Sequence, residues 1–171
     1  MRQDGFLIDA DQSCELARAE IGLFLDDPKF APWREAILGE PVLVMTVYRE
    51  PSYWNVPVLI RGRAAGFVRV IGTGKVAALG AFYQDPAQID TCPVTVTGID
   101  ASEARRRAQE LIHPEEGEAA SDPVFVHDGP PGREAWLIEV IKEGRPYRWI
   151  FVTPAFVYER PAGELLDEAL E

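Results

Sequence analysis

The sequence has no long hydrophobic run and no secretory signal. Its longest mostly apolar stretch, Val76 to Tyr83, is far below the roughly 18 residues that suggest a membrane span. The first residues, Met-Arg-Gln-Asp-Gly-Phe, lack the charged start, apolar middle and small-residue cleavage site of a signal peptide. These absences predict a cytoplasmic protein without membrane contact, unless a leader was removed.

Cysteine and histidine are also scarce. Cys14 and Cys92 lie in different segments, match no metal-ligand spacing and would need an oxidising compartment to form a disulfide. Neither His113 nor His127 has a partner at the three- or four-residue spacing of a helical metal site. We therefore expect two buried free thiols, no metal and no cofactor.

Basic residues are outnumbered by acidic ones. Seventeen Lys and Arg against twenty-eight Asp and Glu give a formal net charge of −11, which argues against non-specific binding to nucleic acid or anionic lipid. Residues 113–122 contribute −4 and residues 159–171 another −4, leaving −3 for the rest. The acid therefore marks a linker and a C-terminal tail rather than a groove that mimics DNA.

In the first half, the patterns predict helix followed by an antiparallel meander. Apolar residues at three- and four-residue steps predict a helix over residues 13–25, and Pro32 and Gly39 bound a second, short helix. Pro57 has no N–H for a ladder, so its strand should lie at an edge or carry a bulge there. From residue 42 the period changes to two, and strands are predicted over 42–48, 54–60, 66–71 and 76–83.

The second half follows the same order. Asp100 and Glu103 predict the start of a helix that Pro114 ends, with Ala104 and Ala108 on its buried face. After the acidic linker, alternating apolar residues predict strands over 124–126, 135–142 and 147–152.

The two meanders align with a constant offset of 82 residues and no gap within the hairpin. Trp54 falls on Trp136, and the pair Gly62-Arg63 falls on Gly144-Arg145. Any two hairpins share an alternation of apolar and polar residues and a glycine in the turn. Here the tryptophan and the Gly-Arg pair match in the same register, which favours a common architecture. Since a unit of roughly 80 residues buries little core by itself, the two units should pack together.

These features resemble the PepSY domain and the wider cystatin-like α+β folds. The resemblance implies two tandem helix-plus-antiparallel-meander units, residues 1–92 and 93–171, packed as one compact protein. It implies a non-catalytic module, often associated with peptidase propeptides or with regulation of envelope proteins by binding. The residues that carry it are Tyr53-Trp-Asn-Val-Pro-Val, Gly66-Phe-Val-Arg-Val, Thr73-Gly-Lys-Val, Ala135-Trp-Leu-Ile-Glu-Val and Arg148-Trp-Ile-Phe-Val.

Aromatic and arginine side chains gather near the hairpin ends, whereas no catalytic set is visible. The serines lie in no nucleophile-elbow context, and Gly72-Thr-Gly-Lys opens a strand rather than the helix that a phosphate loop requires. Tyr, Trp and Arg concentrate binding energy at interfaces, although the tryptophans are better explained as core. The predicted binding residues are Tyr53, Arg61, Arg63, Arg145 and Arg148.

Three functions follow from these patterns. The leading hypothesis is a non-enzymatic regulatory module that binds a protein or peptide at a sheet edge or concave face. The second is an enzyme or small-molecule binder with a site between the halves, using His127, Asp128 or Glu139; otherwise Glu139 faces solvent or pairs with an arginine such as Arg148. The third is a cytoplasmic immunity or inhibitor protein, which the acidic balance mildly favours. The oligomeric state is not predicted.

Overall fold

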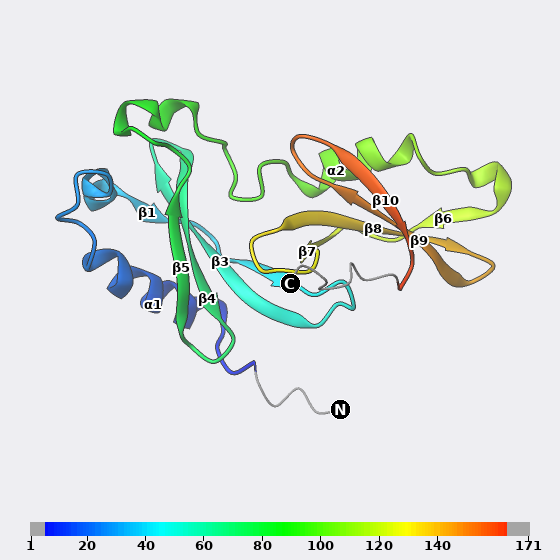
Figure 1. The fold of residues 1–171 in the computed structure, drawn as a ribbon, viewed down its shortest axis with the longest axis horizontal. Helices are drawn as coiled ribbons and strands as arrows, with labels where there is room; N and C mark the ends of the chain where they lie inside the picture. Colours follow the sequence, from blue (N-terminus) through cyan, green and yellow to red (C-terminus); the bar gives the residue numbers. More distant parts are fainter. Residues whose placement is uncertain (1–5, 164–171) are drawn as a thin grey trace, which may run out of the picture. The chain divides into compact units, whose positions relative to one another are not determined.

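A computed structural model describes residues 6–163 as an α+β protein (Figure 1). The chain divides into two compact units. Unit 1 comprises the chain up to Val44 together with Pro51–Val96, and unit 2 comprises Met45–Glu50 together with the chain from Thr97. The segment Met45–Glu50 therefore belongs with unit 2, although the sequence places it within residues 1–92.

Unit 1 begins with a helix, as predicted, but the helix starts three residues earlier. The side chain of Asp9 accepts from the Gln12 amide, and the Gln12 side chain accepts from the Asp9 amide, forming a capping box. The predicted second helix is the 3₁₀ helix η1. The elements of unit 1 are α1 (Ala10–Gly22), η1 (Ala31–Glu35), β1 (Ile37–Leu38), β2 (Val42–Met45, whose last residue is in unit 2), β3 (Pro51–Ile60), β4 (Arg63–Ile71), β5 (Val76–Ala81) and η2 (Pro86–Thr91).

The strands of unit 1 follow the order β2-β3-β4-β5, and β1 also pairs with β3. Helix α1 packs on one face of this sheet (Figure 1). Val56, Val58 and Ile60, at the predicted period of two, are buried against Ala17 and Ile21 of α1 in one core cluster. Asn55 and Pro57 between them are buried too, so burial itself does not alternate along β3. The core of unit 1 therefore lies between the helix and the sheet.

Pro57 lies in the middle of the sheet rather than at an edge. Gly39 donates its N–H to the Pro57 carbonyl at 2.9 Å, and the N and O atoms of one strand residue point to the same side. The Pro57 nitrogen, which carries no hydrogen, therefore faces the residues that follow β1. A β-bulge lies between Val58 and Leu59, so the edge alternative is wrong and a bulge is found one residue away.

In unit 2, a helix also precedes the strands. Helix α2 begins after Asp100, whose carboxylate accepts from the Glu103 amide at 2.8 Å, as predicted. Residues 113–122, predicted as an acidic linker, contain η3 and β6. The elements are α2 (Ala101–Gln109), η3 (Pro114–Glu116), β6 (Glu118–Ala120), β7 (Val124–His127), β8 (Glu134–Lys142), β9 (Arg145–Val152) and β10 (Val157–Pro161).

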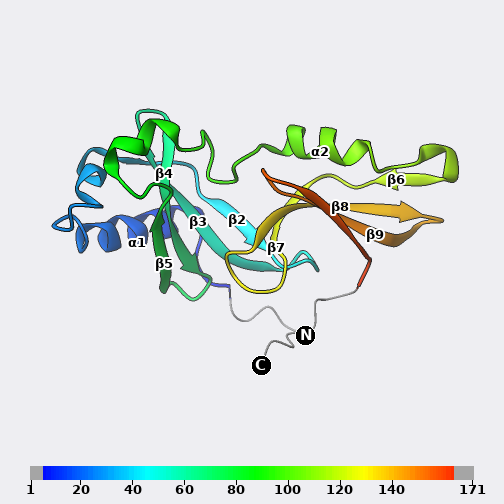
Figure 2. The same ribbon diagram turned by 45° about the horizontal axis from the view of Figure 1, so that its top comes forward.

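Both faces of the unit 2 sheet are covered. The strands follow the order β10-β9-β8-β7, β6 also pairs with β8, and Met45 pairs in parallel with Val126. Helix α2 runs along β8 and β9 on one face (Figure 2). On the other face Val47, only 6% exposed, packs with a cluster that includes Trp149 and Phe151. None of the described helices has the length and apolar character needed to cross a membrane.

The hairpins β3–β4 and β8–β9 have the same register at the offset of 82 residues. Val56 pairs with Val68, and Ile138 pairs with Ile150. Each hairpin has a register shift at the equivalent place, between residues 58 and 59 and between residues 140 and 141. The first residue of each two-residue turn has positive φ, 51° at Arg61 and 53° at Glu143, which is the turn geometry that matches strand twist.

The match extends beyond the hairpins. The pair Leu38–Val58 of β1 and β3 corresponds to the pair Ala120–Val140 of β6 and β8. Trp54 Nε1 lies 3.3 Å from the carbonyl oxygen of Ile8, and Trp136 Nε1 lies 2.9 Å from that of Ile99. Ile8 and Ile99 each directly precede the aspartate that caps the helix. In both units, therefore, a tryptophan on the first hairpin strand binds the entry to the helix.

Candidate functional site

The predicted binding residues of unit 1 are engaged locally. The Arg61 guanidinium pairs with the exposed Asp90 carboxylate at 3.0 Å, and Arg63 donates to the Cys92 carbonyl at 3.4 Å. Tyr53 is only 1% exposed, and the Arg69 guanidinium lies 4.7 Å from its ring centroid. Tyr53 therefore belongs to the interior and does not present a binding surface.

Arg148 is also internal, because it holds the segment after α2 against β9. Its guanidinium lies 2.7 Å from Glu118 and 2.9 Å from Glu159, and it donates to the Leu111 carbonyl. The side chains of Arg148 and Glu118 are 14% and 3% exposed. This arginine is therefore a structural ion-pair partner. Glu139 pairs with an arginine, as one of the predicted alternatives has it, but that arginine is Arg49 rather than Arg148.

Loss of the Glu118 carboxylate should make stability less dependent on pH. Hydrogen bonds from Arg148 and from the His113 amide hold the pKa of Glu118 below its ordinary value of 4.5. A carboxyl with a lowered folded-state pKa stabilises fully above the unfolded-state pKa, and the stabilisation is lost as pH falls through the folded-state value. We expect Glu118→Gln to have a lower urea midpoint than wild type at neutral pH, and the difference to narrow below pH 4.5.

The matched control for this measurement is Glu143→Gln, which removes an exposed carboxylate in the β8–β9 turn. It should leave the urea midpoint near that of wild type throughout. A constant difference between Glu118→Gln and wild type across the acidic range would contradict the role of the Glu118 charge.

Arg145 lines a cavity of about 540 Å³ in unit 2, which we name the Trp149 pocket. It lies beside the β8–β9 hairpin, on the sheet face that Val47 covers. Two elements far apart in the sequence, the 47–49 segment and this hairpin, supply most of its wall. The lining residues are Val47, Tyr48, Arg49, Glu139, Arg145, Pro146, Trp149, Ala162 and Gly163.

A tight loop presents Tyr48 and Arg49 to the Trp149 pocket. The Thr46 amide donates to the Glu50 carbonyl at 2.8 Å, and the Arg49 amide donates to the Thr46 carbonyl at 2.9 Å. Arg49 has a φ of 63°, in the left-handed region, as the loop requires. With Val47 buried, the loop is fixed on the sheet while the Tyr48 side chain stays 55% exposed.

The charges in the Trp149 pocket are only partly matched. Trp149 Nε1 donates to Glu139 Oε2 at 3.1 Å, and Arg49 Nη2 lies 3.6 Å from Glu139 Oε1. Arg145 is exposed and has no carboxylate within ion-pair distance among the described residues. The Tyr48 and Trp149 rings meet edge to face, with centroids 6.0 Å apart. The pocket thus combines aromatic surface with one excess positive charge in an acidic chain.

His127 and Asp128, candidates for proton transfer, lie at the end of β7 and at the start of the loop that follows it. His127 Nδ1 lies 2.5 Å from the Gly129 carbonyl. Asp128 is 1% exposed and accepts from the Tyr158 hydroxyl at 2.7 Å and from Arg160. Burial and the hydrogen bond to Asp128 raise the pKa of Tyr158 to about 12. This carboxylate is already bound by these donors and ties the loop to β10.

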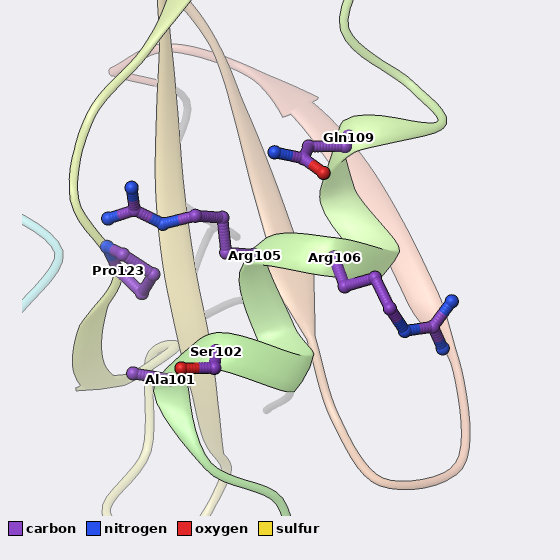
Figure 3. A pocket seen from close by; sticks show the side chains of 6 residues that line it. All are labelled: Ala101, Ser102, Arg105, Arg106, Gln109 and Pro123. Atoms are coloured by element: carbon purple, nitrogen blue, oxygen red, sulfur yellow. The ribbon is translucent and has the colours of Figure 1, made fainter.

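A second hollow, of about 340 Å³, lies along α2 (Figure 3). Arg105 points toward Pro123 and Arg106 points away from it (Figure 3). Both arginines already have carboxylate partners, since Arg105 pairs with Asp122 and Arg106 pairs with Glu103 at 2.8 Å. This hollow therefore has less unmatched charge to offer a ligand than the Trp149 pocket.

The described part of the chain holds no group of side chains suited to a metal ion. No three His, Cys, Asp or Glu side chains among residues 6–163 are grouped so that they could hold a metal ion. Both cysteines are free; Cys92 is buried as predicted, whereas Cys14 is half-buried. Comparison with family models, with curated proteins and with solved structures finds no match to the chain.

Sequence reasoning missed Tyr48 and Arg49. Tyr48 is the last residue of the strand predicted over 42–48 and Arg49 follows it, whereas Arg145 and Trp149 lie about a hundred residues later. The available signal was the type of residue, because a Tyr-Arg pair in a turn resembles the other aromatic and arginine pairs at hairpin ends. Only the assignment of residues 45–50 to unit 2 brings the two groups together.

Proposed function

We propose that this chain is a non-catalytic binding module that holds a segment of a partner protein or peptide at the Trp149 pocket. The observation that supports it is the pocket itself, in which the exposed Tyr48 ring and the Arg145 guanidinium flank Trp149. Tyr, Trp and Arg supply large contact areas and directional polar groups at interfaces. Because the excess charge is positive, the expected ligand is a peptide with an acidic residue beside an apolar or aromatic one.

The repeated register supports a related proposal about architecture. We infer that the chain contains two copies of one helix-plus-meander unit, as the resemblance to the PepSY domain implies. Shared bulge positions and the shared tryptophan contact to the helix entry are details that alternation of apolar residues alone does not require. In this interpretation only the second copy carries a pocket of this kind, because Glu139 and Trp149 correspond to Pro57 and Phe67 in the first.

The binding proposal is tested with a phage-displayed library of linear peptides selected on the full chain. The affinity of an enriched peptide for Arg145→Glu and Tyr48→Ala is then compared with wild type by fluorescence anisotropy. Each residue is exposed, so the fold should be retained. We expect each variant to bind at least about tenfold more weakly, as loss of an interface anchor typically does.

The matched control is Arg61→Glu, which reverses an exposed arginine in the corresponding hairpin turn of unit 1. It should bind the peptide like wild type. Failure to enrich any peptide, or equal weakening by Arg61→Glu, would contradict a peptide site at the Trp149 pocket.

A small-molecule ligand in the same pocket is the second candidate. Its volume of about 540 Å³ lies within the range of roughly 300–1,000 Å³ that ligand pockets occupy. A thermal-shift screen of anionic metabolites separates the two candidates, because a ligand that binds the native state must raise the midpoint saturably. A shift that Arg145→Glu abolishes would favour the small molecule. The immunity or inhibitor hypothesis stays a prediction from charge.

A further inference from the structure

Strand β5 ends the strand order of unit 1, and its outer side has no strand partner among the described residues. Its inner side pairs with β4 from Val70–Val76 to Gly66–Ala81. The register of this pair shifts between Arg69 and Val70 of β4, which lie opposite the start of β5. From Ala78 to Ala81 the pairing of β5 is regular. An open strand edge of this kind is a template for pairing with another chain.

Alternation along the strand identifies which backbone groups face outward. The Phe82 amide donates to the Ala65 carbonyl at 2.8 Å, so Phe82 faces β4. In an antiparallel pair the hydrogen-bonding direction alternates from one residue to the next. Gly80 therefore also faces β4, whereas Leu79 and Ala81 direct their N–H and C=O groups to the open side.

Strand β5 carries none of the side chains that protect a sheet edge from pairing. Natural edges are protected by charge and by proline, and β10 has Glu159, Arg160 and Pro161. By contrast, β5 reads Val-Ala-Ala-Leu-Gly-Ala, with neither a charge nor a proline. Just beyond it, Phe82 is 41% exposed and lies 5.6 Å from Phe67 between ring centroids. The two terminal strands therefore differ in the protection they carry.

We propose that the open edge of β5 pairs antiparallel with β5 of a second copy of this chain. The charges at its two ends favour this occupant. Lys75 directly precedes β5, and the exposed Asp85 lies four residues beyond its other end, where its side chain caps η2. An antiparallel pair therefore brings the lysine end of each strand to the aspartate end of the other. A parallel pair would place the two lysines together.

The same charges select a register. Two antiparallel copies of β5 are related by a two-fold axis, and we place Gly80 on it. Leu79 of each copy then lies opposite Ala81 of the other, and the outward N–H and C=O groups of these residues form the hydrogen bonds between the copies. In this register the Lys75 end of each strand lies at the end of the partner's strand from which the chain continues to Asp85 and η2. Since Gly80 has no side chain, the two backbones meet at the axis without a side-chain clash.

A second copy is favoured over an unrelated acidic protein because the edge is neutral. Two chains of net charge −11 repel each other, and β5 itself carries no acidic side chain, so the electrostatic cost of approach is smaller along this strand than along a strand that carries acid. A strand of six residues buries less surface than a standard stable interface of roughly 1,600 Å². The dimer should therefore be weak and depend on protein concentration.

Sedimentation equilibrium of the full chain tests this proposal. We expect a monomer–dimer equilibrium that Ala77→Lys, which adds a charge at an exposed position of β5, weakens at least tenfold. Lys75→Glu should weaken it as well, because it sets like charges opposite each other. Arg18→Glu, a charge reversal on the exposed side of α1, is the control and should leave the equilibrium unchanged.

Amide hydrogen exchange provides a second readout that does not require a variant. The Leu79 and Ala81 amides should become more protected as protein concentration rises, whereas the Gly80 amide, which faces β4, should not change. A chain that stays monomeric at every concentration would overturn the proposal. So would a dimer that Ala77→Lys leaves intact, or a monomer whose β5 edge instead captures an extended peptide.

Discussion

Replacing Asp128 by alanine should lower the free energy of unfolding by about 3–5 kcal/mol, the usual cost of removing one partner of a buried ion pair. Asp128 is 1% exposed, and the side chain of Arg160 beside it is 12% exposed. Tyr158 donates its hydroxyl to the same carboxylate at 2.7 Å, and the Arg133 guanidinium lies 3.4 Å from it. The substitution leaves a guanidinium and a hydroxyl without an acceptor in the interior.

Urea unfolding measures this effect, with Asp26→Ala as the matched control. Asp26 pairs with Arg34 at 3.0 Å, but its side chain is fully exposed, so its loss should cost less than about 1 kcal/mol. Tyr158→Phe should fall between the two, because it removes only one donor. A cost for Asp128→Ala no larger than that for Asp26→Ala would show that water reaches the cluster.

Local patterns predicted most of the elements, because the residues that determine a helix or a strand are close together in the sequence. The period of two predicted the strand that contains the buried Val56 and Val58, and the cap at Asp100 placed the start of α2. The offset of 82 residues also predicted which residues correspond, since a hairpin's register is fixed by its own turn. Helix α1 begins earlier than predicted because Asp9 and Gln12, which are not part of the apolar stripe, cap its N-terminus.

Pairings between distant segments were not predictable in the same way. Nothing near Pro57 indicates that β1 will flank its strand, and nothing near Val47 indicates that it will pack against Trp149. Arg148 faces two acids, Glu118 and Glu159, that alternation on β9 does not identify. An arginine at a hairpin end is equally compatible with an exposed binding role and with a buried ion pair, and only burial separates them.

The candidate site shows the same limit. Of the five predicted binding residues, only Arg145 lines the Trp149 pocket, because the fold buries Tyr53 and Arg148 and gives Arg61 and Arg63 partners of their own. Residue type alone selected the kinds of side chain that line this pocket, aromatic rings and guanidinium groups. Which of these residues meet is decided by the packing of the 45–50 loop, and that packing depends on contacts across the sequence.

Gly66→Ala should destabilise unit 1 by about 1–3 kcal/mol, as overpacking of a filled core does. A Cβ at this position would lie 2.3 Å from the Gly80 carbonyl oxygen and 2.5 Å from Cζ2 of Trp33. The first of these atoms belongs to the backbone of β5, so the strands themselves must move apart. The equivalent residue of unit 2 is Arg148, whose long side chain reaches the Leu111 carbonyl and Glu118.

Urea midpoints of two further variants test this explanation. Gly22→Ala makes the same change at the end of α1, where an added Cβ meets nothing within 4 Å, and it should stabilise the chain by up to about 1 kcal/mol. In a Trp33→Leu background, Gly66→Ala should lower the free energy of unfolding by less than it does in wild type, because the ring contact is gone. Some of the loss should persist, because the contact with the Gly80 carbonyl oxygen remains. Full recovery would assign the whole cost to the ring, and no cost for Gly66→Ala would show that β4 and β5 are not packed as closely as described.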